Sequence, residues 1–122
     1  MPVKLIALLA KRRDLERSAF VAWYEEYHVP TILEVMPGII DYRRNFLPET
    51  TAGIDAVTEI CFADKASYDA AMAAVCSPAA SARIERDQQM LFDPEGIRTS
   101  LVDERGGPCL PLRFGPGERL LL

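Results

Sequence analysis

Residues 26–45 read EYHVPTILEVMPGIIDYRRN, and the change from a helical to an extended pattern that decides the fold falls within them. Pro30 lacks a backbone N–H and disfavours a helical conformation at the residue before it, so we expect the first helix to break or kink there. A further helical turn is expected to follow and to stop at Pro37-Gly38. Residues 38–48 then predict a strand.

The segments before this stretch predict a strand followed by a helix. Residues 2–11 form a short apolar run that is typical of a strand buried on both faces. Asp14 is a suitable N-cap for a helical pattern that begins at Leu15. The apolar side chains of this pattern recur at spacings of three and four residues, at Ala19, Phe20, Trp23 and Tyr27.

The segments after the stretch predict two further strands with helices between them. Strict alternation of side-chain type indicates a strand, and Asp or Ser before a helical pattern indicates an N-cap. The expected elements are a turn at 49–53, a strand at 54–63, an alanine-rich helix after Asp64, a second helical segment from Ser77-Pro78 to about Leu91, and a strand at 96–104.

The resulting order is β-α-β-β-α-β, which predicts an α+β, ferredoxin-like fold with a four-stranded antiparallel sheet and both helical regions on one face. We expect one domain over residues 1–104 and an extended C-terminal tail over 105–122. The strands are apolar or mixed on both faces, so the face without helices must be buried as well. The simplest cover is a second copy, giving a homodimer that encloses a cavity as a dimeric α+β barrel.

The composition excludes several classes of protein. A net charge of −4 without a basic stripe argues against a nucleic-acid partner. The three cysteines are widely spaced, so neither a disulfide framework nor a metal site is expected. No signal peptide is recognised and no run approaches the length of a membrane span. We therefore expect a cytoplasmic protein without a membrane partner.

The sequence resembles the EthD-like family of dimeric α+β barrels over about residues 2–104. The matching features are the initial VKLIALLAKR, the Trp- and Tyr-rich first helix ending in His-Val-Pro, the Pro-Gly before Tyr-Arg-Arg-Asn, and the Phe-Asp before the last strand. Such families often have a glycine at the place of Ala56, an aromatic residue at the place of Cys61, and Asp-x-x-His where this chain has Glu25-Glu26-Tyr27-His28.

The resemblance implies a homodimer with one pocket per subunit between the sheet and the helices. Relatives of this kind include cofactor-free polyketide cyclases, methylmuconolactone-type isomerases, and proteins encoded beside ether-degrading oxygenases. Because one fold hosts many activities, a function borrowed in this way is an analogy.

His28 is the first candidate catalytic residue, because its side chain can both accept and donate a proton near neutral pH. We expect it at a helix C-terminus, which favours the charged imidazole. The alternatives are a plain helix cap and, by analogy with other dimeric barrels, ligation of haem.

Tyr42 is the second candidate, since a phenol donates a hydrogen bond to a developing oxyanion. Alternation places Tyr42 and Arg44 on one face of their strand and Arg43 and Asn45 on the other. Either face could look into the cavity, so Arg44 and Asn45 are alternative substrate-binding residues. A salt-bridged strand without a role in binding is the third reading.

Glu59 is the third candidate, because a carboxylate in the middle of a strand must be paired, exposed or used. Burial would raise its pKa towards that of a working acid or base, whereas pairing with an arginine is equally compatible with the sequence. Four further side chains are candidate lining residues for substrate: Trp23, Tyr24, Tyr27 and Cys61.

These residues predict a cofactor-independent acid–base enzyme (a cyclase, isomerase, dehydratase or decarboxylase) acting on a small apolar compound, aromatic or lactone in type. The catalytic set is His28, Tyr42 and Glu59, with no metal. Two other hypotheses remain: a non-catalytic carrier or accessory protein of an oxygenase pathway, and a haem- or oxygen-using barrel.

Overall fold

The computed structural model describes residues 1–106, apart from the side chains of residues 50 and 51. Within this range the chain forms four strands, four α-helices and one π-helical turn. In order they are β1 (Val3–Lys11), α1 (Arg17–Trp23), the π-helical turn η1 (Tyr24–His28), α2 (Val29–Val35), β2 (Ile39–Thr51), β3 (Ile54–Phe62), α3 (Lys65–Val75), α4 (Pro78–Leu91) and β4 (Phe92–Val102).

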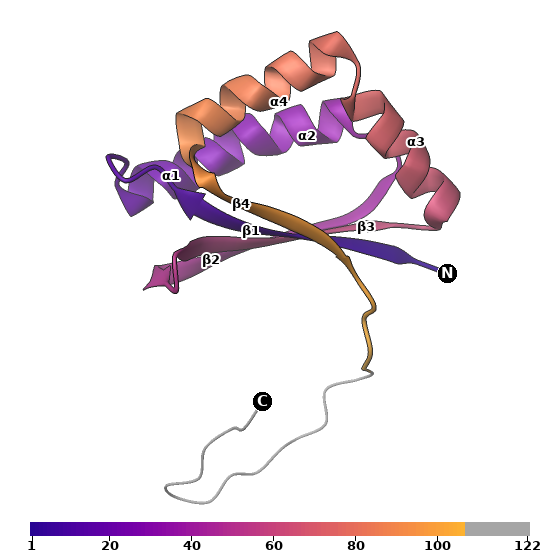
Figure 1. The fold of residues 1–122 in the computed structure, drawn as a ribbon, viewed down its shortest axis with the longest axis horizontal. Helices are drawn as coiled ribbons and strands as arrows, with labels where there is room; N and C mark the ends of the chain where they lie inside the picture. Colours follow the sequence, from indigo (N-terminus) through magenta and orange to yellow (C-terminus); the bar gives the residue numbers. More distant parts are fainter. Residues whose placement is uncertain (107–122) are drawn as a thin grey trace, which may run out of the picture.

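The strands form one sheet in the order β2-β3-β1-β4, and every neighbouring pair is antiparallel. All helices lie on the same side of this sheet, as Figure 1 shows. The predicted ferredoxin-like fold is therefore confirmed. The other side of the sheet, which we call the open face, carries no helix formed by residues 1–106.

The strand register decides which side chains face the helices. Tyr42 of β2 pairs with Ile60 of β3, and Arg44 pairs with Thr58. Thr58 and Ile60 are buried, so Tyr42 and Arg44 lie on the helix-covered side. The intervening residues, among them Arg43, project from the open face.

The π turn η1 interrupts the regular α-helix just before Pro30, where the sequence predicts a break or kink. The further helical turn expected after Pro30 is present as α2, which continues to Val35. Pro30 lies at the beginning of α2, where a missing N–H is least costly, and the N–H of Val29 reaches back five residues to Tyr24. The proline is therefore accommodated by a π turn, and Thr31 donates its hydroxyl to the carbonyl of Tyr27 at 3.0 Å.

Two of the three predicted helix caps are confirmed. Asp64 accepts a hydrogen bond from the N–H of Ser67, and Ser77 accepts one from the N–H of Ala80. The prediction for Asp14 is wrong, because α1 begins later and the carboxylate of Asp14 is bound by the guanidinium of Arg12.

Strand ends account for the remaining differences. The expected turn at 49–53 shrinks to a tight hairpin turn, since β2 extends to Thr51 and both Ala52 and Gly53 have positive φ. β4 also begins earlier than predicted, at Phe92. Residues 107–122 of the expected tail lie outside the described residues.

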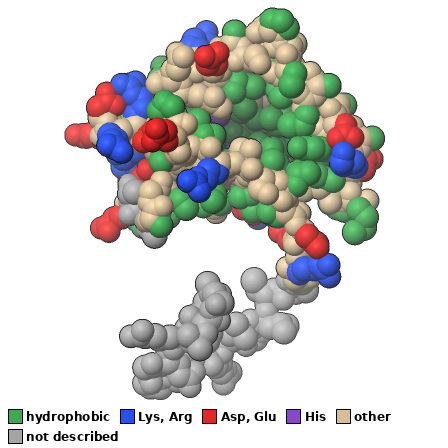
Figure 2. Space-filling model, in the orientation of Figure 1, with side chains coloured by type: hydrophobic (Ala, Val, Ile, Leu, Met, Phe, Trp, Pro, Cys, Tyr) green, Lys and Arg blue, Asp and Glu red, His purple; other side chains and the backbone are tan. Residues whose placement is uncertain are grey.

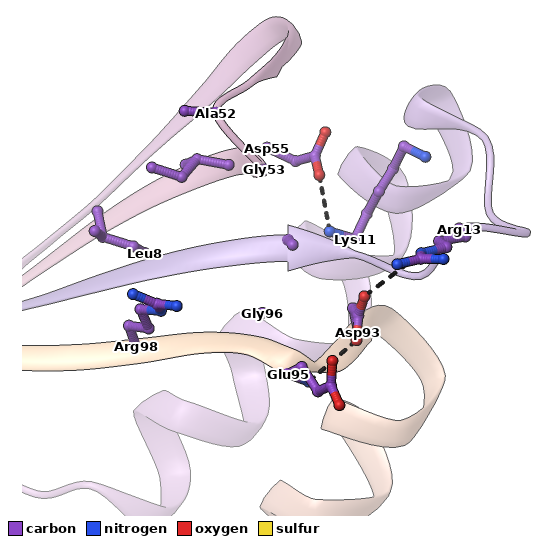
Figure 3. Close-up of a pocket in the computed structure, with 12 residues that line it drawn as sticks. Leu8, Lys11, Arg13, Ala52, Gly53, Asp55, Asp93, Glu95, Gly96 and Arg98 are labelled. Atoms are coloured by element: carbon purple, nitrogen blue, oxygen red, sulfur yellow. Dashed lines mark hydrogen bonds and ion pairs between the residues drawn. The ribbon is translucent and has the colours of Figure 1, made fainter.

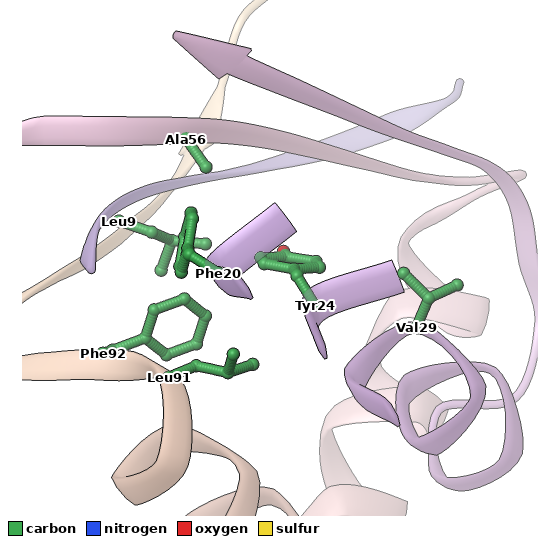
Figure 4. Packing of buried hydrophobic residues seen from close by; sticks show 7 residues of the cluster. All are labelled: Leu9, Phe20, Tyr24, Val29, Ala56, Leu91 and Phe92. Carbon is green, nitrogen blue, oxygen red and sulfur yellow. The ribbon is translucent and has the colours of Figure 1, made fainter. Parts of the chain in front are cut away.

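The core consists of two clusters between the sheet and the helices. In the first cluster, aromatic rings pack edge to face, with the ring of Tyr24 5.9 Å from that of Phe20 and 5.8 Å from that of Phe92. Its buried members, shown in Figure 4, are Leu9, Phe20, Tyr24, Val29, Ala56, Leu91 and Phe92. The second cluster, which lies around α3, consists of Ile32, Met36, Ile60, Phe62 and Ala71.

Among the described residues, no helix is long and apolar enough to cross a membrane.

Candidate functional site

His28 is the last residue of the π turn and lies inside the helix-covered side of the molecule. It is 6% exposed, and its ring contacts those of Tyr24 and Phe92, at centroid distances of 5.1 and 5.7 Å. Its Nδ1 lies 3.2 Å from Oδ2 of Asp87 on α4. The predicted candidate is therefore a buried imidazole with one carboxylate partner.

The electrostatic environment of His28 differs from the expected one. The prediction of a helix C-terminus is wrong, because α2 follows directly after η1. Burial lowers the pKa of His28 below its ordinary value, and the hydrogen bond to Asp87 opposes that effect in part. The resting imidazole is therefore neutral at pH 7, and it can act as a base.

Asp87 was not singled out in the sequence, although the pattern held a signal. It is 3% exposed and lies on the buried side of α4, at helical spacing from Ile84 and Leu91. A carboxylate at a core position of an amphipathic helix needs a partner. That partner is His28, with Arg86 Nε 3.9 Å from the second carboxylate oxygen.

A second buried polar group lies beside this pair. The hydroxyl of Tyr24 is 2.6 Å from that of Thr58 in the middle of β3. Burial raises the pKa of Tyr42, and the adjacent phenol of Tyr24 raises it further. Tyr42 therefore stays protonated and lies on the same side of the sheet as His28.

Arg44 shares this side of the sheet but is occupied. Its guanidinium donates two hydrogen bonds to the carboxylate of Glu25, at 2.9 and 2.6 Å, and a third to the carbonyl of Tyr42. It also lies 4.9 Å from the centre of the Tyr42 ring. These contacts fasten η1 to β2, which matches the salt-bridged reading better than the substrate-binding one.

Glu59, Asn45 and Cys61 lie on the open face, so the structure does not bring them to His28. Glu59 accepts hydrogen bonds from Lys4 at 3.0 Å and from Asn45 at 3.1 Å. These bonds lower the pKa of Glu59, the opposite of the shift expected for a buried acid or base. Burial raises the pKa of the half-buried Cys61 thiol, which does not favour a thiolate.

The expected aromatic lining is reduced to one residue. Tyr24 points into the core, whereas Trp23 is exposed and Tyr27 is 50% exposed. Trp23 and Tyr24 are neighbours in the chain and therefore point in different directions from the helix, whereas Trp23 and Tyr27, four residues apart, share its exposed side.

An apolar hollow opens between α4 and β4 in front of α2, as Figure 2 shows. The helix-facing side of β4 is poorly covered here: Leu101, which pairs with Leu5, is 41% exposed. Ile32, one turn after His28 on the same helical face, belongs to the core at this place. The half-buried apolar side chains of this region include Leu5, Met72, Val75 and Ile84.

A groove of about 360 Å³ lies on the outside of the helical layer, between η1 and α4. Asp87 is part of its lining, together with Tyr27 and Arg86. We call it the outer groove. Asp87 therefore lies between the outer groove and the buried ring of His28.

A larger cavity of about 500 Å³ lies at the end of the sheet, where the β2–β3 turn approaches the end of β1 and the start of β4 (Figure 3). Its charges are mixed and partly paired: the N–H of Lys11 donates to Asp55 at 3.0 Å, and Arg13 lies 3.8 Å from Asp93. None of the predicted site residues lines it. Within residues 1–106, no group of three or more His, Cys, Asp or Glu side chains could hold a metal ion.

Comparison with known proteins gives one family and several solved structures of the same fold. The EthD domain model matches residues 12–95. No match is found among curated protein sequences. An EthD-family protein from Bacillus halodurans superposes with a TM-score of 0.63 at 21% identity, over 86% of this chain and 100% of that one.

Two more distant structures share the fold. The cofactor-independent oxygenase SnoaB from Streptomyces nogalater gives a TM-score of 0.56 at 13% identity, over 87% of this chain and 95% of its own. A dimeric ferredoxin-like protein of unknown function from Jannaschia sp. gives 0.55 at 15% identity, over 85% and 100%. At these identities the likeness concerns the fold alone.

Proposed function

Since the chain belongs to the EthD domain family, we propose that it is a cofactor-independent enzyme that moves a proton on a small apolar carbonyl or phenolic compound bound in the apolar hollow. The observation that carries this proposal is the buried imidazole of His28, paired at Nδ1 with Asp87. A neutral imidazole in apolar surroundings is a base close to working pH.

The proposed step is the removal of a proton from a carbon next to a carbonyl group. The proton moves to Nε2 of His28, and its electron pair becomes an enolate. The imidazolium then returns the proton to another atom of the same molecule, so that the net reaction is an isomerisation or a ring closure without a co-reactant. Tyr42, kept protonated by its raised pKa, donates a hydrogen bond to the enolate oxygen.

The open face supports the proposal of a homodimer. Ile6 and Leu8 of β1 and Val57 of β3 lie there half-buried, and the Lys4–Glu59 ion pair lies beside them. A two-fold interface brings the same surface of both copies together, and such a surface has apolar side chains in its middle and polar side chains at its rim. The Jannaschia protein of the same fold is described as dimeric. Glu59, Asn45 and Cys61 then belong to the interface.

Proton transfer can be tested before a natural substrate is known. The protein is incubated in D₂O with a β-diketone, a butenolide lactone and an anthrone, and deuterium uptake at carbon is followed by NMR. We expect faster exchange in at least one probe, and a loss of about 100-fold or more in His28→Gln. Tyr27→Phe, which changes an exposed ring one residue away, is the control and keeps the wild-type rate.

Each rival function gives its own result. A carrier binds a probe with equal affinity in the wild type and in His28→Gln, without exchange in either. An oxygen-using enzyme consumes O₂ when a probe is added, and a haem protein develops a strong visible absorption band with added haemin. Exchange that is unchanged in His28→Gln overturns the proposal.

A further inference from the structure

We propose that Asp87 is a positioning residue that holds His28 as its Nδ1–H tautomer, leaving Nε2 as the nitrogen that exchanges protons with substrate. This inference rests on the proposed function, because it assigns the partner of the proposed base. The carboxylate oxygen Oδ2 lies 3.2 Å from Nδ1. A carboxylate accepts but does not donate, so Nδ1 must carry the proton.

The surroundings of Asp87 hold its side chain in place. The residue is 3% exposed, yet its second oxygen faces the guanidinium of Arg86 at 3.9 Å and the residue borders the outer groove. The carboxylate is therefore fixed by the helix packing on one side and balanced by a cation on the other.

Few other groups can affect the ring. On α4, the side chain of Asp87 contacts the imidazole of His28, and Arg86 contacts Asp87 in turn. From its own turn the ring contacts Tyr24. Tyr42, on the same side of the sheet, interacts with Tyr24. Phe92 of β4 is apolar. Asp87 is thus the one charged side chain in direct contact with the imidazole among the described residues.

The arrangement has a consequence for catalysis. A neutral histidine in water prefers the Nε2–H form, in which Nε2 cannot accept a proton. The Asp87 carboxylate reverses this preference and also stabilises the imidazolium that forms when Nε2 takes the proton. Loss of the carboxylate therefore affects both the tautomer and the pKa of His28.

The experiment uses ¹⁵N-labelled full-length protein from which any histidine tag has been removed. The chain has one histidine, so the imidazole region of a two-bond ¹H–¹⁵N spectrum reports His28 without assignment. At a pH above the pKa of His28, we expect the imidazole of the wild type to be in the Nδ1–H form. Asp87→Ala is expected to shift the ring towards the Nε2–H form, and Asp87→Asn, which keeps the shape, to lower the pKa of His28.

Two further variants separate positioning from stability. Asp87→Glu restores a carboxylate and is expected to recover the Nδ1–H form in part. Glu85→Gln removes a charge from an exposed position of the same helix and is expected to leave the ring unchanged. Exchange of the responsive probe falls by about tenfold or more in Asp87→Ala, whereas circular dichroism confirms folding.

The two proposals fail in different ways. An unchanged tautomer and pKa in both Asp87→Ala and Asp87→Asn overturn the positioning role, even if His28→Gln abolishes exchange. Unchanged exchange in His28→Gln overturns the proposed function, whatever the ring spectrum shows.

Discussion

The hydroxyl of Tyr24 lies 2.6 Å from the hydroxyl of Thr58, and this hydrogen bond joins the π turn to the middle of the sheet across the core. Both residues are buried. Tyr24 is also the first residue of η1, the turn that ends at His28, so the bond fixes the height of this turn above the sheet. The position of the candidate base therefore depends on a polar contact inside an aromatic cluster.

Tyr24→Phe should lower the free energy of unfolding by about 1–2 kcal/mol, because it leaves the buried hydroxyl of Thr58 without its partner. Tyr27→Phe makes the same chemical change on the exposed side of the helix and should have little effect. Urea denaturation of both variants measures the difference. Equal stabilities of the two variants would show that the Tyr24–Thr58 bond contributes nothing net.

Stability should also depend on the titration of His28. Burial lowers its pKa below the ordinary value of 6.5, so between that folded-state pKa and 6.5 the unfolded chain binds more protons than the folded one. The contribution of His28 to the free energy of unfolding is therefore complete above pH 6.5. It is lost as the pH falls through this window, by at most about 1.4 kcal/mol per pH unit.

Urea denaturation at several pH values between 7.5 and 5.5 tests this slope. His28→Gln should flatten it, because no other histidine titrates in this range. If the wild type became more stable as the pH fell, attraction between the imidazolium and Asp87 would outweigh burial, contrary to the expected direction.

Most of the fold could be predicted because its signals are local. Strand alternation and the N-caps Asp64 and Ser77 depend on neighbouring residues only. The break or kink predicted at Pro30 takes the form of a π turn just before it, which accommodates the proline by shifting the backbone hydrogen bonds. No pattern of side chains in the sequence predicts such a shift.

The site was harder to predict because it depends on contacts between distant segments. His28 was recognised from its chemistry, but its partner Asp87 lies 59 residues later and is paired by helix packing. Glu59, in contrast, was predicted to belong to the site and does not lie near His28. Alternation gave the two faces of β3 correctly, yet it could not say which face the helices cover, and Glu59 lies on the uncovered one.

The proposed dimer predicts an effect of charge on the open face. Ile6→Arg places a cation in the middle of that face, opposite Glu59 of β3 and Ser100 of β4 in the register, where a second copy would bury it at high cost. Light scattering after gel filtration should give twice the chain mass for the wild type and the chain mass for the variant. Leu33→Arg, at an exposed position of α2, should remain dimeric. A monomeric wild type would contradict the dimer itself.

The close approach of β1 and β4 gives a further prediction. A Cβ added at Gly96 would lie 2.4 Å from the Cβ of Ala10, at the place where the β1–β4 register shifts. Gly96→Ala should therefore lower the free energy of unfolding by about 1–3 kcal/mol through overpacking.

Ala10→Gly alone should lower the free energy of unfolding by about 0.5–1 kcal/mol, the usual effect of glycine in a strand. The double variant should be more stable than Gly96→Ala, since it removes the clash, and urea denaturation of all four proteins measures this coupling. A double variant that is no more stable than Gly96→Ala would show that the strands move apart to accept the methyl group.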